Sequence, residues 1–194
     1  MRIKLTLGLV LFFGTGLGLG QVRPAGFQRT VPLKLGVGYS NFDSDWNGRV
    51  AGPSLWLDWN LSQAPGLLNK IALEAEGRHL GENNKGFQLR YNTFAGGPVY
   101  NFSVRHDRWL RPYAGFLLGY GAFSFSPSVS GYSHDSRTIY TPMGGAEFPL
   151  AARLKLRAGY EYQYWPSLFH GHALNPNGLT IGTSYDFGAK TSRE

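Results

Sequence analysis

The sequence predicts an all-β protein folded as an eight-stranded antiparallel up-and-down transmembrane β-barrel. Three observations lead to this fold class. One segment near the C-terminus has the length of a membrane-crossing strand and two chemically different faces. Seven further segments share that alternation and are separated by turn signals. The chain also opens with an export-type segment, and no later apolar run is long enough to form a transmembrane helix.

The most informative segment is residues 154–164, whose chemistry alternates from one residue to the next. The apolar set is Leu154, Leu156, Ala158, Tyr160, Tyr162 and Tyr164, and the polar set is Lys155, Arg157, Glu161 and Gln163. A period of two indicates a β-strand. Strands of soluble proteins usually have about five or six residues, whereas a strand that crosses a bilayer needs about 9–11. We therefore expect the apolar face to contact lipid and the charged face to line the interior.

The N-terminal residues 1–20 are interpreted as a signal peptide. Arg2 and Lys4 precede an apolar run that ends with the small residues Gly18 and Gly20. This order is typical of a secretory signal with a small-x-small cleavage site. An uncleaved membrane anchor is the alternative, but the run is short and rich in glycine. The expected organisation is then a lead-in at 21–30, an outer-membrane barrel at 31–187 and a tail at 188–194.

The first two predicted strands are residues 31–42 and 50–61, and Asn47-Gly48 supplies a strong turn signal between them. Their odd positions are mainly apolar, and their even positions include Lys34 and Asp58. Pro53 interrupts the second strand because proline cannot donate to a ladder, so we expect a bulge or a loop flank there.

The third segment, residues 69–80, fits both helical spacing and period two. Its strand neighbours favour the strand interpretation, which would turn Glu74, Glu76 and Arg78 inward. The fourth strand, 87–102, is expected to turn Leu89, Tyr91, Thr93 and Val99 outward and Gln88, Arg90 and Asn92 inward.

The last four predicted strands are 112–125, 137–150, 154–164 and 178–187, with a loop at 126–135. The turn at 149–152 is short and the connection at 165–177 is long. Short periplasmic turns beside longer outer loops are typical of such barrels.

An eight-stranded barrel is just wide enough for side chains to fill its interior, so inward charges must pair. The predicted interior charge network is Glu74, Glu76, Arg78, Arg90, Arg157 and Glu161. Arg157 is expected to pair with Glu74, Glu76 or Glu161. We interpret this network as packing that plugs the barrel, rather than as a catalytic or ion-conducting site.

Residues 182–187, Gly182-Thr-Ser-Tyr185-Asp-Phe187, resemble the C-terminal signal strand of outer-membrane barrels. With the signal peptide and eight amphipathic strands, the chain resembles the small barrel family of the OmpA transmembrane domain and OmpX. The resemblance implies an integral protein of the Gram-negative outer membrane, exported with a cleaved signal peptide. It implies that the assembly machinery and periplasmic chaperones recognise Gly182, Tyr185 and Phe187. Residues 188–194 depart from the family, which usually ends on the aromatic residue.

The composition excludes several classes of function. The chain has no cysteine, which excludes disulfides and thiolate metal sites. Its +7 formal charge is dispersed, and nucleic-acid binding normally needs a focused basic stripe. No fingerprint predicts a cofactor or a metal, and His170-Gly-His172 supplies only two ligands. The expected partners are outer-membrane lipid and lipopolysaccharide, and the expected state is a monomer.

We expect a non-enzymatic integral barrel with a role in envelope structure or surface interaction through its outer loops. Two alternatives remain open at this point. A lipid A-modifying barrel enzyme could use Ser133-His134-Asp135, although contiguous residues are not evidence for a triad. A soluble lipocalin-like barrel that binds a ligand would need the apolar face inside and the charged face outside.

Overall fold

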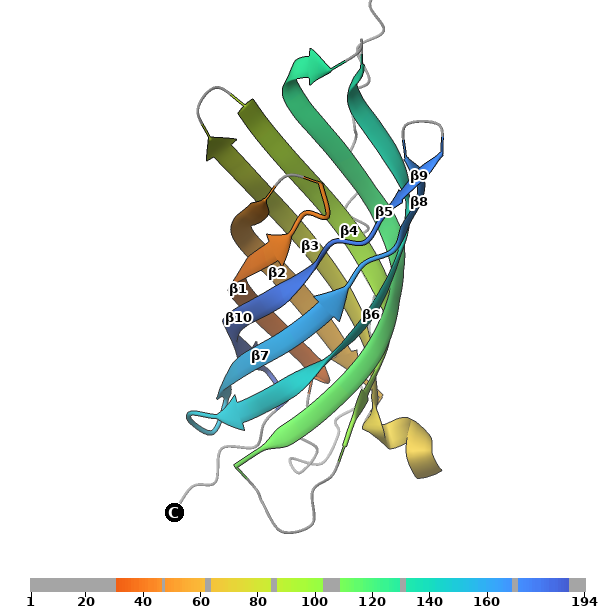
Figure 1. Ribbon diagram of the computed structural model, residues 1–194. Coiled ribbons are helices and arrows are strands. Elements are labelled where there is room, and N and C mark those ends of the chain that lie inside the picture. Colours follow the sequence, from red (N-terminus) through yellow and green to blue (C-terminus); the bar gives the residue numbers. More distant parts are fainter. Residues whose placement is uncertain are drawn as a thin grey trace, which may run out of the picture.

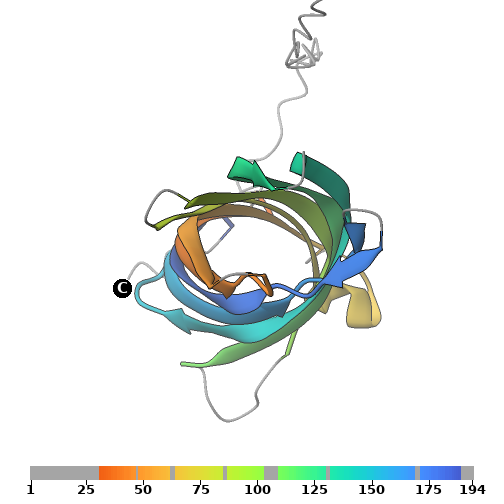
Figure 2. The same ribbon diagram turned by 45° about the horizontal axis from the view of Figure 1, so that its top comes forward.

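The structure is a computed structural model that describes residues 31–46, 48–61, 64–84, 87–102, 109–129, 132–168 and 171–188. The predicted signal peptide, the lead-in before residue 31 and tail residues 189–194 lie outside the described part of the chain. The described strands close into a ring, which Figure 2 shows obliquely along its axis.

Eight strands form this closed barrel (Figure 1). They are β1 (Leu33–Asp43), β2 (Arg49–Asn60), β3 (Ile71–Asn84), β4 (Phe87–Asn101), β5 (Arg111–Val129), β6 (Tyr132–Pro149), β7 (Leu154–Tyr162) and β10 (Asn177–Asp186). Sequence neighbours pair antiparallel, and β1 pairs with β10 to close the ring. The predicted fold class is thereby confirmed. Closure gives every strand of the barrel a hydrogen-bonded neighbour on both sides, as a sheet that spans hydrocarbon requires.

Three short elements lie in connections. The 3₁₀ helix η1 (Gly66–Lys70) joins β2 to β3, and the strands β8 (Trp165–Leu168) and β9 (His172–Leu174) form a small hairpin between β7 and β10. The prediction of a plain loop at 165–177 missed this hairpin. Among the described residues, no helix has the length and apolar character needed to cross a bilayer.

The barrel wall has unequal height. β5 has 19 residues and β6 has 18, whereas β1 has 11 and β7 has 9. In Figure 1 the long strands rise above β7 and β10 at one end of the barrel. The predicted loop at 126–135 is therefore wrong, because most of this stretch continues the two long strands.

Pro53 lies inside β2, so the expected bulge or loop flank at this residue is also wrong. Pro53 is in register with Tyr39 of β1, and the β1–β2 pairing continues without a shift. The described β2–β3 ladder has pairs at Ala51 and Ser54 but not between them. The missing donor of the proline therefore falls where the ladder to β3 is interrupted.

The register across β3, β4, β5 and β6 arranges the outward side chains in rows. Successive rows are Ala75, Gly96, Leu118, Tyr140; then Gly77, Phe94, Tyr120, Thr138; then His79, Asn92, Ala122, Ser136; then Gly81, Arg90, Ser124, His134. The outer surface thus changes from apolar, through a row with two aromatic residues, to polar. Aromatic residues at such a boundary are typical of the membrane–water interface.

Candidate functional site: the filled lumen and the outer rim

The lumen half nearest the barrel termini holds a network of ion pairs. Arg157 of β7 meets Glu74 of β3 side-on, with Nη1–Oε2 at 2.9 Å and Nη2–Oε1 at 3.0 Å. Arg157 Nε also donates to the Tyr113 hydroxyl at 2.9 Å, and its guanidinium lies 5.0 Å from the Trp56 ring centroid. This arginine is therefore held by a carboxylate, a hydroxyl and an aromatic face together, which offsets the cost of burying its charge.

Three further cations complete the network. Arg78 pairs with both Glu76 and Glu161. Lys34 pairs with Asp58 at 3.1 Å and with Glu147 at 2.6 Å, and Lys155 pairs with Asp186 at 2.8 Å. Five of the six residues predicted for the interior network, Glu74, Glu76, Arg78, Arg157 and Glu161, have buried side chains in it.

Glu147 and Asp186 also belong to the network, although neither was among the residues predicted for it. The strand carrying Glu147 was the weakest in the sequence because Pro142 and Gly144-Gly145 interrupt its alternation. Glu147 does share inward parity with Thr141 and Met143, both of which are buried. That shared parity is the signal that could have placed Glu147 inside.

The facing predicted for the fourth strand is reversed: Thr93 and Val99 are buried although they were expected outside, and Gln88 and Asn92 are exposed although they were expected inside. Arg90 shares this error and does not belong to the network. Arg90 is exposed on the outside of β4, whereas Leu89 and Tyr91 are buried inside. For Leu89, Arg90 and Tyr91, in the upper part of the strand, the physical reason is the height of the wall. Above the aromatic row the wall leaves the lipid, so its outer face is polar and its inner face packs against other apolar side chains.

The other half of the lumen is apolar. Its buried side chains share a single cluster: Phe42, Val50, Leu80, Leu89, Tyr91, Leu117, Phe123, Ile139, Trp165 and Leu174. The Tyr91 ring meets Phe123 edge-on with centroids 4.7 Å apart, and it meets Trp165 at 5.5 Å. The described lumen is therefore filled by ions in one half and by aromatic and aliphatic side chains in the other.

Two polar ties hold the connections over the apolar half. The Tyr91 hydroxyl donates to the backbone oxygen of Ser44 at 2.7 Å. Asp45 Oδ2 accepts from the backbone nitrogen of Asn175 at 2.8 Å, although the two residues are 130 positions apart. The β1–β2 connection is thereby tied to the segment after β9 at this end of the barrel.

Inward glycines make room for the large aromatic side chains. A Cβ on Gly36 would collide with the Trp56 indole, and a Cβ on Gly121 would collide with the Trp165 indole. A Cβ on Gly182 would meet Trp56 and the backbone oxygen of Val37. Packing alone therefore requires glycine at 182, independently of any recognition of this residue by the assembly machinery.

The other two residues of the predicted assembly signal lie on the outer face. Tyr185 and Phe187 are both partly exposed, and their rings meet edge-on with centroids 4.9 Å apart. Their outward position makes them available for recognition before the barrel closes. That the assembly machinery reads them stays a prediction.

The Ser133-His134-Asp135 run does not form a catalytic constellation. Ser133 and His134 are exposed, and Asp135 pairs with Arg137 at 3.0 Å. Neighbouring residues of a strand point to opposite faces, so His134 and Asp135 diverge. Within the described ranges, no three His, Cys, Asp or Glu residues are grouped as metal ligands, and His170 lies outside those ranges.

The lipocalin-like alternative conflicts with the facing of the strands. That alternative needs charged residues outside and the apolar face inside at mid-height. The structure instead exposes Val37, Leu55 and Ile181 on the outer wall, and it buries Lys34, Glu74 and Arg157 within the lumen. Such a band of exposed apolar side chains is the surface that lipid covers.

Comparison with known proteins agrees with this geometry. Residues 11–187 match the model of the outer membrane protein beta-barrel domain. Neisserial surface protein A has a similar structure, with a TM-score of 0.61 at 13% identity over 79% of this chain and 95% of that chain. Ail of Yersinia pestis has a TM-score of 0.53 at 17% identity, over 79% of this chain and 96% of that chain. OprG of Pseudomonas aeruginosa has a TM-score of 0.50 at 12% identity, over 79% of this chain and 94% of that chain. A search of curated proteins found no match.

Proposed function

The chain belongs to the outer-membrane β-barrel domain family, and we propose that it serves as a closed, non-enzymatic barrel whose outer rim interacts with molecules at the cell surface. The observation that carries this proposal is the filled lumen. A transport function would need a passage, yet Arg157, Glu74 and Tyr113 link the walls in one half, and Leu117 and Trp165 are fully buried in the other.

The rim proposed as the functional surface is built from three pieces. They are the connection between β1 and β2, the upper ends of β5 and β6, and the β8–β9 hairpin. Trp46 in the first piece is exposed, although it also contacts Phe123 with ring centroids 5.9 Å apart. A half-exposed tryptophan on a tied-down connection is a typical anchor for a binding partner.

The orientation follows from insertion from the periplasm. The start of β1 and the end of β10 lie at the same end, where Lys34 is in register with Asp186. We place this end in the periplasm and the tall ends of β5 and β6 outside the cell. The proposal includes cleavage of residues 1–20, delivery by periplasmic chaperones, and contact with lipid and lipopolysaccharide as a monomer.

Two measurements test the proposal. In planar bilayers the purified protein should show no stable conductance, because ion pairs and aromatic side chains occupy the lumen. Cells that display it should adhere to an immobilised anionic glycan. Ail of Yersinia pestis forms a complex with the heparin analogue sucrose octasulfate, which recommends that molecule as a soluble competitor.

The rim variant replaces residues 166–173, which hold most of the β8–β9 hairpin, with a short Gly-Ser turn. Its matched control replaces the turn at 150–153 at the opposite end. Adhesion should fall for the first variant and persist for the second at equal surface amounts. Steady single-channel conductance, or adhesion no greater than that of cells without the protein, would refute the proposed function.

A further inference from the structure

The two outward rows above the aromatic row, which holds Phe94 and Tyr120, carry basic side chains that the lumen does not explain. Arg90 of β4 and His134 of β6 belong to one row, and His79 of β3 belongs to the row beneath it. His79, Arg90 and His134 are all exposed on the outside of the wall. None of them takes part in the lumen network, so the filled barrel does not account for them.

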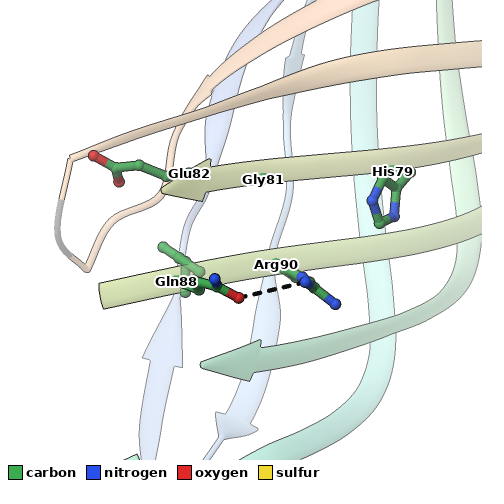
Figure 3. Close-up of a pocket in the computed structure, with 6 residues that line it drawn as sticks. His79, Gly81, Glu82, Gln88 and Arg90 are labelled. Atoms are coloured by element: carbon green, nitrogen blue, oxygen red, sulfur yellow. Dashed lines mark hydrogen bonds between the residues drawn. The ribbon is translucent and has the colours of Figure 1, made fainter. Parts of the chain in front are cut away.

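The surface is hollowed on both sides of Arg90. One hollow of about 230 Å³ is lined by His79, Gly81, Glu82, Gln88, Leu89 and Arg90 (Figure 3). A second, of about 130 Å³, is lined by Gln88, Arg90, Ser124 and Ser126. Arg90 lines both hollows, and its Nη2 donates a long hydrogen bond of 3.4 Å to Gln88 Oε1. Arg90 is exposed, so N–H donors of its guanidinium are accessible to a ligand at this surface.

The sign of the charge on this surface is positive. No carboxylate belongs to the two polar rows, which hold only His79, Arg90 and His134 as titratable residues among the described positions. Asp135 has the opposite parity and pairs with Arg137. Glu82 also has inward parity, and its carboxylate lies beside Gly48 in the β1–β2 connection. Figure 3 shows Glu82 at the far end of the hollow from His79.

The height of the rows indicates which chemical group the basic side chains would meet. The row directly beneath them holds Phe94 and Tyr120, and the next holds Leu118 and Tyr140. The basic side chains therefore lie at the level of the lipid headgroups. The anion that occupies this level in an outer leaflet of phosphorylated glycolipid is the phosphate group. A guanidinium matches phosphate oxygens in a two-point, charge-assisted geometry.

We propose that Arg90, with His79 on β3 and His134 on β6, forms a binding site for the phosphate group of an outer-leaflet glycolipid. The site rests on the proposed orientation, which places the tall ends of β3–β6 outside the cell. It deepens the proposed function by giving the wall a specific lipid contact beneath the rim. Gln88, Asn92 and Ser124 supply the neutral polar surface around it.

The test measures binding of lipid A to the folded full-length protein in detergent, with bisphosphorylated and enzymatically dephosphorylated lipid A as the two probes. The wild-type protein should prefer the phosphorylated probe. Arg90→Gln should lower affinity for it on the order of tenfold, as expected for a lost hydrogen bond to a charged group. The affinity of Arg90→Lys for the phosphorylated probe should lie between those of the wild type and Arg90→Gln, because lysine keeps the charge but loses the two-point geometry of the guanidinium.

The matched control is Arg111→Gln, which removes an exposed arginine from the opposite end of β5. This control should bind the phosphorylated probe as the wild type does. Equal affinity of the wild type for the two probes would overturn the site, and this outcome does not depend on any variant. Unchanged binding by Arg90→Gln, or an equal loss in Arg111→Gln, also overturns it.

An epitope inserted between Val129 and Tyr132 separates this inference from the proposed function. Detection of the epitope on intact cells, together with no phosphate preference, overturns the site and leaves the orientation standing. An epitope detected only after permeabilisation overturns the orientation and the site together. Competition by sucrose octasulfate as strong as that by phosphorylated lipid A would assign the surface to soluble anions instead.

Discussion

Arg157 and Glu74 meet across the lumen through two parallel hydrogen bonds, although they are 83 residues apart in the chain. The contact joins β7 to β3, two strands that are not neighbours in the barrel wall. Such a pair fixes the distance between opposite walls as well as neutralising two buried charges. It selects one of the three carboxylates that inward parity made available to Arg157.

Removing one partner of this pair should destabilise the barrel strongly. Arg157→Met leaves Glu74 buried without its main cation, at a cost of about 3–5 kcal/mol. Glu74→Leu combined with Arg157→Met should cost less than the two single changes summed. The measurement is a double-mutant cycle from urea unfolding in lipid vesicles. A cycle of Arg157→Met with Glu161→Leu should give weaker coupling, because Glu161 pairs with Arg78.

Additive free energies for Arg157 and Glu74 would contradict the role assigned to their contact. Equal coupling in both cycles would show that the network responds as a whole rather than through specific pairs.

A second prediction concerns the space for Trp56. Gly36→Ala should destabilise the barrel by about 1–3 kcal/mol, because the atoms nearest to the new methyl group belong to the Trp56 indole. Trp56→Leu should rescue Gly36→Ala. The same change should not rescue Gly182→Ala, whose methyl group also meets the backbone oxygen of Val37.

Gly77→Ala is the matched control, because the nearest atom to its added methyl group lies at 3.9 Å. The free energy of unfolding should hardly change for this variant. Failure of Trp56→Leu to restore Gly36→Ala would show that the glycine serves the backbone instead of the indole.

Period-two alternation predicted most of the barrel because lipid and the lumen impose opposite polarity on alternate residues. Leu154 and Tyr160 were placed outside and Arg157 and Glu161 inside on that ground, and the structure has them there. The rule fails where the wall rises above the membrane. Leu89 and Arg90 then exchange roles, because water surrounds the outer face and the inner face becomes a dry core.

For the candidate site, the sequence predicted which side chains face inward better than it predicted which of them pair. Parity placed five of the six predicted charges correctly inside, but it misplaced Arg90 and it could not choose among Glu74, Glu76 and Glu161 as the partner of Arg157. That choice depends on which strands face each other across the lumen. The apolar cluster around Trp165 was missed because its strand, β8, lies in a connection with no periodic pattern.

A third prediction concerns depth in the bilayer. Leu118→Arg places a basic side chain in the apolar part of the wall and should cost about 2–4 kcal/mol. Ala122→Arg lies on the same face of β5, two rows higher, and should cost about 0–1 kcal/mol. Urea unfolding in lipid vesicles measures both. Equal costs would show that the apolar row and the polar row share one environment.

A fourth prediction concerns the terminal strand. Phe187→Ala removes an outward ring near the barrel end, so refolding of purified protein into vesicles should change little. Its assembly in cells should fall, because the assembly machinery is proposed to read this residue. Leu179→Ala, on the outward face of the same strand, is the control and should assemble normally. Equal defects in cells and in vitro would refute a signal function for Phe187.

The most direct test of the filled, lipid-embedded barrel is a nitroxide accessibility scan along β5 in lipid vesicles. The chain has no cysteine, so each introduced label is unique. Labels at Ala114, Phe116 and Leu118 should be accessible to oxygen. Labels at Tyr113 and Leu117 should be shielded from both oxygen and a water-soluble nickel chelate. A label at Ser124 should be accessible to the chelate. Chelate access at Leu117 would mean an open aqueous lumen, and chelate access at Phe116 would mean that the wall is not in lipid.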